Sequence, residues 1–132
     1  MESKNKFMLR AIELSVKSAN GTGGPFGCVV VKNNKIIAEG SNNVTFLNDP
    51  TAHAEILAIR KTCKELKSSK LFGYSIYVTL QPCEMCLHAI LNARISRLYY
   101  GASDLENISL QKVYNTISVS YTHLTLPTTP YV

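Results

Sequence analysis

Two short motifs hold the residues of this chain whose types and spacing could do chemistry. One contains His53 and Glu55, and the other contains Cys83 and Cys86 directly after Pro82. An imidazole nitrogen and two thiolates are preferred ligands of Zn²⁺, and three protein ligands leave the fourth tetrahedral position to water, as catalytic zinc sites require. We therefore expect one zinc ion per chain, bound by His53, Cys83 and Cys86.

Helix geometry decides whether these side chains can meet. Residues three apart on a helix lie about 60° apart around its axis, so Cys83 and Cys86 can bind one ion. Residues two apart lie about 200° apart in mid-helix, but His53 and Glu55 can both face one cleft in a first helical turn. If a helix begins at each motif, its partially positive end also favours thiolate and hydroxide.

Glu55 is the candidate general acid and base. A carboxylate beside zinc-bound hydroxide can accept a proton from water and deliver it to a leaving amine. His-x-Glu followed by Pro-Cys-x-x-Cys is the pattern typical of zinc-dependent deaminases. It predicts hydrolytic deamination, in which hydroxide adds to an amidine-like ring carbon and ammonia departs.

Other uses of a Cys-x-x-Cys pair fit less well. A redox pair needs no His-x-Glu motif, and haem attachment requires His directly after the second cysteine, where Leu87 stands. A closed structural zinc site needs a fourth protein ligand. The spare thiols, Cys28 and Cys63, lie in apolar patterns that are typical of buried cysteine.

The hydrophobic pattern predicts the elements that position these motifs. Apolar residues recur at helical spacing from Met8 to Ala19, and two β-branched runs joined by Asn33 and Asn34 predict an antiparallel hairpin. The further elements are a helix with the apolar stripe Ile56, Ile59, Cys63 and Leu66, capped by Asp49 or Thr51; a strand over 75–80; a helix opened by Pro82; a strand over 98–100; and a helix over 105–114. This order predicts a three-layer α-β-α fold of the α/β class, with helices on both faces of a mixed sheet.

Composition limits the class of protein. A length of 132 residues suits one domain, and 45% hydrophobic with 17% charged residues indicates a folded chain. We expect a cytoplasmic protein, because the sequence shows neither an apolar signal-peptide core nor a run of about 18 apolar residues. The net charge of +5 suits phosphate-bearing partners or a solvated basic face.

The last fourteen residues differ from the rest. Residues 119–132 contain no Lys, Arg, Asp or Glu and four Thr, and they resemble the translation of a sequencing adapter. We therefore predict a domain over residues 1–118 and a non-native or disordered tail over 119–132, with no role for His123. A native flexible tail is the alternative.

Over residues 6–101 the chain resembles the cytidine deaminase-like superfamily, and within it both guanine deaminases and tRNA-specific adenosine deaminases. The segments that look more like guanine deaminases are 23–27, 39–44, 48–55 and 58–63. The segments that look more like the tRNA enzymes are 78–80, 94–97 and 100–102.

The resemblance implies a purine substrate, with guanine converted to xanthine and ammonia. It implies that Asn42 hydrogen-bonds the purine and that Phe26 lines the ring; an amide and an aromatic face suit these tasks. The alternative substrate is adenosine in tRNA, whose phosphates could meet the lysines of one helix face, Lys61, Lys64, Lys67 and Lys70.

The resemblance also implies a homodimer and a longer C-terminal part. In guanine deaminases an aromatic pair stands where this chain has Leu91 and Asn92, and a Gly-Phe-Asp-Asp stretch follows, which this chain lacks after Gly101. We therefore expect the C-terminal elements of the fold to be missing. A truncated, inactive zinc-binding domain is a third hypothesis.

Overall fold

The computed structural model describes residues 3–21, 23–117 and 120–124, and these build one mixed sheet with helices on both faces. The strands lie in the order β2-β1-β3-β4-β5. Strand β1 is antiparallel to both β2 and β3, whereas β3, β4 and β5 are parallel to one another. The strands are β1 (Gly27–Lys32), β2 (Lys35–Ser41), β3 (Ser75–Leu80), β4 (Arg97–Ala102) and β5 (Ser120–His123).

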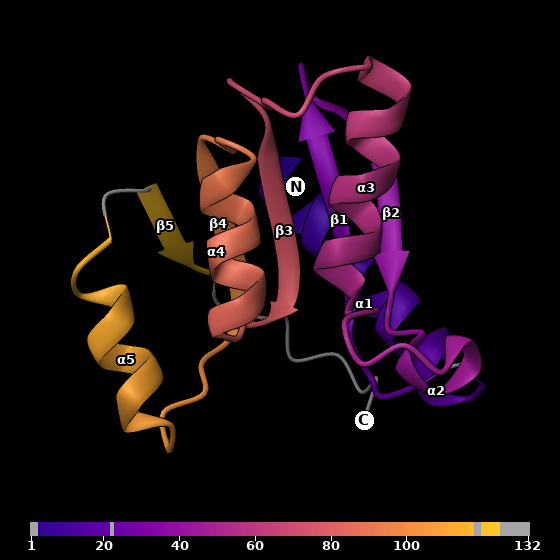
Figure 1. Ribbon diagram of the computed structural model, residues 1–132, viewed down its shortest axis with the longest axis vertical. Helices are drawn as coiled ribbons and strands as arrows, with labels where there is room; N and C mark the ends of the chain where they lie inside the picture. Colours follow the sequence, from indigo (N-terminus) through magenta and orange to yellow (C-terminus); the bar gives the residue numbers. More distant parts are fainter. Residues whose placement is uncertain (1–2, 22, 118–119, 125–132) are drawn as a thin grey trace.

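The helices form the two outer layers. Figure 1 shows α3 and α4 in front of the sheet and α1 behind it. The helices are α1 (Ser3–Ala19), the short α2 (Val44–Leu47), α3 (Ala54–Leu66), α4 (Glu84–Asn92) and α5 (Ile108–Tyr114). The predicted three-layer α/β fold is therefore confirmed.

Alternation along the central strands divides the core into two clusters. On β1, Cys28 and Val30 belong to the cluster on the side of the sheet that α3, α4 and α5 cover, whereas Val29 and Val31 belong to the cluster on the side of α1. Strand β3 follows the same rule, because Tyr77 packs with the α1 cluster and its neighbours pack with the other. Since successive side chains of a strand point to opposite faces, a sheet covered on both sides needs apolar residues at nearly every position.

Glycines let the two outer layers approach the sheet closely. A Cβ on Gly27 would clash with the carbonyl oxygen of Ala11 in α1, and one on Gly40 would clash with the carbonyl oxygen of Ala54 in α3. Backbone atoms cannot move away as the end of a flexible side chain can. Glycine at these two positions therefore sets the distance from each helix to the sheet.

Several local predictions are confirmed. Asn33 and Asn34 have φ values of 52° and 63°, as the tight turn of the predicted hairpin requires. The fully buried Cys28 is a packing residue of β1, as predicted. The helix predicted over 105–114 is present as the shorter α5.

Other local predictions were wrong. Neither Asp49 nor Thr51 caps α3, because its N-cap is His53; Asp49 instead accepts hydrogen bonds from the backbone and hydroxyl of Thr51 in the preceding turn. The predicted stripe of α3 is right only in part: Ile59 and Cys63 pack against the core, but Leu66 is exposed. The buried residues of the helix are Ala54, Glu55, Ala58 and Thr62. Small residues face the sheet here because Gly40 brings the helix too close for larger ones.

Part of the segment 119–132, whose composition differs from that of the rest of the chain, belongs to the sheet. Residues 120–123 form β5, which pairs in parallel with β4, and His123 Nε2 lies 3.1 Å from the carbonyl oxygen of Gly101. The remaining residues from 125 onwards lie outside the described part, and the domain boundary at residue 118 stays a prediction.

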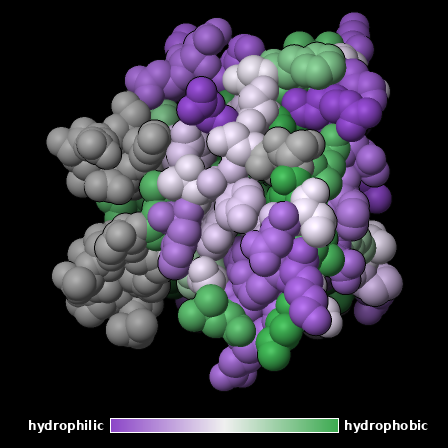
Figure 2. Space-filling view, turned by 90° about the vertical axis from the view of Figure 1, so that its left-hand side faces the viewer, coloured by the Kyte–Doolittle hydropathy of each residue, from purple (hydrophilic) through white to green (hydrophobic). Residues whose placement is uncertain are grey.

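On one side of the molecule polar and apolar side chains are mixed (Figure 2). Figure 2 shows the side of the molecule that carries α5 and β5, where apolar side chains form separate small areas among polar ones. Within the described ranges, every helix is too short or too polar to cross a membrane.

Candidate active site

One edge of the sheet gathers both sequence motifs. Strands β3 and β4 are parallel, so their carboxyl ends lie side by side, and the antiparallel β1 begins at the same edge. Helices α3 and α4 also start there, with His53 and Cys83 as their N-cap residues in extended conformation. Ligands of open α/β sheets bind in this kind of position.

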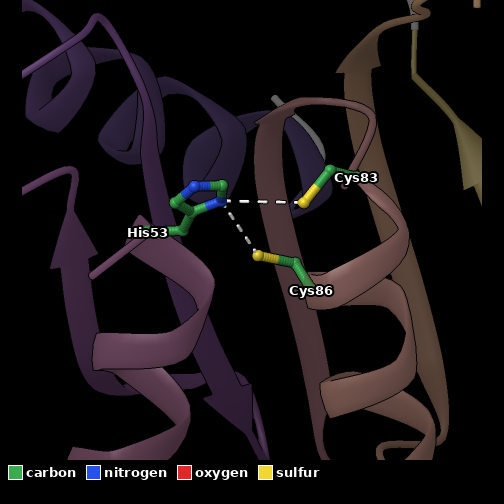
Figure 3. A group of neighbouring side chains, drawn as sticks. All are labelled: His53, Cys83 and Cys86. Carbon is green, nitrogen blue, oxygen red and sulfur yellow. Dashed lines mark hydrogen bonds between the residues drawn. The ribbon is translucent and has the colours of Figure 1, made fainter. Parts of the chain in front are cut away.

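His53, Cys83 and Cys86 fit the coordination of a zinc ion. His53 Nδ1 lies 3.6 Å from the sulfur of Cys83 and 3.4 Å from that of Cys86, and Figure 3 shows the imidazole of α3 facing both sulfurs of α4. Zinc–nitrogen and zinc–sulfur bonds of about 2.0 and 2.3 Å at a tetrahedral angle place nitrogen and sulfur about 3.5 Å apart. The three ligand atoms all lie within 4.8 Å of one another, so one ion can reach all three.

The two thiols differ in their readiness to ionise. The hydrogen bond from Cys86 lowers the pKa of Cys83 to about 5, and His53 adds to this effect. The same hydrogen bond raises the pKa of Cys86, with burial acting in the same direction. In the metal-free pair one sulfur therefore holds the negative charge and the other holds the shared proton, and a metal ion would replace that proton.

Glu55 lies in the first turn of α3 and is 6% exposed. Burial removes water from its carboxyl group and raises its pKa to about 7, and the neighbouring Cys83 also contributes. This value belongs to the metal-free site. The positive charge of a bound zinc ion would lower the pKa again and favour the carboxylate, the form that can accept a proton from water.

A cavity of about 130 Å³ opens beside this group. That volume is on the order of ten times what a single water needs. Its wall contains five of the six residues that the sequence singled out, namely Phe26, Asn42, His53, Glu55 and Cys83. The sixth, Cys86, is fully buried behind them and contacts His53.

Asn42 and Phe26 are held in the wall by their surroundings. The Asn42 side-chain oxygen accepts a hydrogen bond of 2.9 Å from the backbone N–H of Val44 at the start of α2. The hydroxyl of the buried Ser18 donates towards the carbonyl oxygen of Asn42, at 2.8 Å. A Cβ on Gly24 would lie 2.7 Å from the ring of Phe26, so the glycine leaves room for that ring.

Gln81 and Asp104 belong to the wall but were missed in the sequence. They follow the last residues of β3 and β4 closely, and Val78 and Leu80 of β3 also line the cavity. The signal that could have identified the two polar residues is their place after two parallel strands, whose carboxyl ends share one edge.

Comparison with known proteins identifies the family. Residues 1–102 match the family model described as cytidine and deoxycytidylate deaminase zinc-binding region. The chain belongs to this family. Its fold and its zinc-binding site are therefore those of a deaminase-family domain, and His53, Cys83 and Cys86 could hold the zinc.

Two curated relatives differ in their substrates. Guanine deaminase of Bacillus subtilis is 53% identical over 97 residues, which cover 73% of this chain and 62% of that protein. A tRNA-specific adenosine deaminase of Agrobacterium fabrum is 45% identical over 108 residues, which cover 79% of this chain and 68% of that protein. The match thus spans less than two thirds of the length of the guanine deaminase.

Solved structures of both kinds share the fold. A structure from work on A-to-I editing by tRNA:A34 deaminases superposes with a TM-score of 0.86 at 35% identity, over 93% of this chain and 100% of the other. The X-ray structure of guanine deaminase from Bacillus subtilis has a TM-score of 0.75 at 41% identity, over 92% and 85% of the two chains.

Proposed function

We propose that this domain catalyses the hydrolytic deamination of a purine, with guanine converted to xanthine and ammonia. The observation that carries the proposal is the shared wall of one cavity, in which the proton-transfer candidate Glu55 and the metal ligand His53 stand beside Asn42 and Phe26. The 53% identity to a guanine deaminase favours guanine as the substrate.

In this proposal the side chains of the cavity have different roles. Phe26 offers an aromatic face to the base, and Asn42 hydrogen-bonds its edge, which orients the carbon that carries the amino group. When bound, zinc lowers the pKa of a coordinated water to near 7 and so supplies a nucleophile. His53, Cys83 and Cys86 would hold that ion.

Glu55 moves the protons. Its carboxylate accepts a proton from the attacking water, whose oxygen forms the new carbon–oxygen bond. It delivers that proton to the ring nitrogen, then accepts the second proton from the newly added hydroxyl group and delivers it to the amino group. The carbon–nitrogen bond breaks, and ammonia leaves. Water and guanine together contain every atom of xanthine and ammonia, so the reaction needs no further reactant.

Replacing Glu55 tests this assignment. Glu55→Gln keeps the size of the side chain but cannot carry the proton, so we expect turnover to fall by about 10²–10⁴-fold. Ammonia release from guanine measures the rate, and metal analysis should still find one zinc per chain. Glu65→Gln, an exposed position near the other end of α3, is the matched control. Equal rates for both variants would refute the role of Glu55.

Deamination of adenosine in tRNA is the second candidate. The superposition with a tRNA:A34 deaminase structure favours it, as do the lysines on the solvent side of α3 and in the loop after it, Lys61, Lys64, Lys67 and Lys70. Inosine formation in tRNA, with an affinity that falls steeply as salt rises, would support this substrate over guanine.

An assay panel separates these activities from an inactive domain. We propose to test zinc-loaded protein on guanine, adenosine, cytidine and tRNA, and to determine its oligomeric state by analytical ultracentrifugation, because the resemblance implies a homodimer. Ammonia release from one substrate class identifies the activity. One zinc per chain without ammonia from any substrate would favour the inactive zinc-binding domain.

A further inference from the structure

Helix α5 contacts the two residues that precede the metal ligand Cys83. Gln111 and Tyr114 lie three residues apart, hence on one side of α5. Gln111 hydrogen-bonds the side chain of Gln81, and the Tyr114 hydroxyl donates to the carbonyl oxygen of Pro82 at 2.8 Å. Neither α5 residue belongs to the two motifs or lines the cavity within the described part of the chain.

The orientation of the Gln81 amide follows from its partners. The backbone N–H of Asp104 donates to Gln81 Oε1 at 3.1 Å, so an oxygen must face it. Gln111 Nε2 donates to the same oxygen and to the carbonyl oxygen of Asp104, each at 2.8 Å. In return Gln81 Nε2 donates to Gln111 Oε1 at 3.4 Å. Gln111 therefore ties together the ends of β3 and β4, from which Gln81 and Asp104 enter the cavity wall.

Tyr114 acts on the next residue of the same loop. Proline has no N–H, so its carbonyl is the one backbone group of Pro82 that can form a hydrogen bond. The bond from Tyr114 is buried, and the Tyr114 ring packs edge-on against Tyr100 of β4 with centroids 6.2 Å apart. The carbonyl of Pro82 belongs to the peptide unit that continues into Cys83. A fixed carbonyl therefore limits where the Cys83 sulfur can lie.

We propose that Gln111 and Tyr114 are positioning residues that hold the loop 81–83 in place for metal binding. The inference rests on the metal site of the proposed function and extends it to α5. Residues that orient metal ligands through hydrogen bonds typically change metal affinity 10–100-fold when they are replaced. The same contacts align Gln81 and Asp104 in the cavity wall.

Metal binding without substrate tests the proposal. Tyr114→Phe removes one hydroxyl and keeps the ring, so we expect zinc affinity to fall about tenfold in competition with a chelator. In the cobalt-loaded protein, the thiolate-to-metal absorption should shift, because the Cys83 sulfur is less well placed. Lys112→Ala, an exposed position of the same helix, is the control and should change neither readout. An unchanged affinity and spectrum in Tyr114→Phe would overturn the role of Tyr114.

A double replacement separates positioning from stability. Gln111→Met leaves the buried Gln81 amide short of partners, which destabilises the fold as well. Combining it with Gln81→Met removes both amides together and leaves only the partly buried backbone groups of Asp104 without those partners. Thermal stability should therefore recover in part, while zinc affinity stays about tenfold below that of the unaltered chain. Recovery of both would overturn the role of Gln111. None of these readouts involves guanine, so absence of ammonia release from the unaltered chain would count against the proposed function alone.

Discussion

Substitution of Gly40 by alanine tests whether the close packing of α3 on β2 holds the metal site in place. The new Cβ would clash with the carbonyl oxygen of Ala54 and lie 3.1 Å from the Cβ of Ala58. Carbon atoms pack best about 3.5–4.0 Å apart, so α3 must retreat by about 0.5 Å at Ala58 and further at Ala54. Ala54 lies between His53 and Glu55, so both site residues would move with it.

From this displacement of α3 we estimate the loss of stability and the loss of zinc affinity. Overpacking of this kind typically costs about 1–3 kcal/mol of unfolding free energy, which in a chain of this size lowers the melting temperature by about 3–12 °C. Zinc coordination tolerates about 0.2 Å in its distances. A displacement of about 0.5 Å at the N-terminus of α3 exceeds that tolerance, and we expect zinc affinity to fall by at least about tenfold.

Two other glycines serve as controls. Gly27→Ala produces a comparable clash, but against Ala11 of α1 on the opposite face, whereas a Cβ on Gly21 meets no atom within 4 Å. Thermal denaturation should show lower stability for Gly40→Ala and Gly27→Ala, and chelator competition should show weaker zinc binding for Gly40→Ala alone. If Gly40→Ala binds zinc as tightly as Gly27→Ala, the packing of α3 does not position the site.

Two further predictions follow from charged groups. Arg10 forms two hydrogen bonds to Glu39, of 2.6 and 2.9 Å, and holds the pKa of that carboxyl below its usual range; Glu39→Gln should therefore cost about 0.5–1 kcal/mol near pH 7. The pKa of Glu39 is lower in the folded chain than in the unfolded chain. The loss of stability in Glu39→Gln should therefore be complete above the unfolded-state pKa of about 4.3 and vanish as the pH falls through the folded-state pKa. Glu13→Gln, at an exposed position, should change the thermal stability little. In zinc-free protein at pH 7, iodoacetamide should label Cys83, whose pKa is lowered to about 5, much faster than the buried Cys28, as mass spectrometry can show. Equal labelling of the two thiols would contradict the assigned ionisation.

The metal ligands and Glu55 could be predicted from the sequence because their chemistry restricts the residue types. Few side chains can bind zinc or transfer protons, and the spacing of His53, Glu55, Cys83 and Cys86 already placed them at two helix starts. The rest of the cavity wall follows different rules. Asp104 enters it only because β4 pairs in parallel beside β3, and that register depends on contacts between segments far apart in sequence.

Packing detail was harder to predict for a related reason. Prediction from a hydrophobic stripe assumes that the largest apolar residues face the core, and it therefore predicts that Leu66 is buried. In the structure Ala54 and Ala58 face the sheet, because Gly40 on a distant strand removes the space that a larger side chain would need. The need for small residues on α3 comes from Gly40 on β2, so the sequence of the helix alone cannot reveal it.

The cavity wall separates two kinds of residue by where they stand in the fold. His53, Glu55 and Cys83 stand at the starts of helices packed on the core, whereas Asn42, Gln81 and Asp104 follow the ends of strands. Under the proposed function, Asn42 could therefore change with the substrate while the metal site stays intact, whereas Gln81 and Asp104 are tied through Gln111 to the loop that carries Cys83.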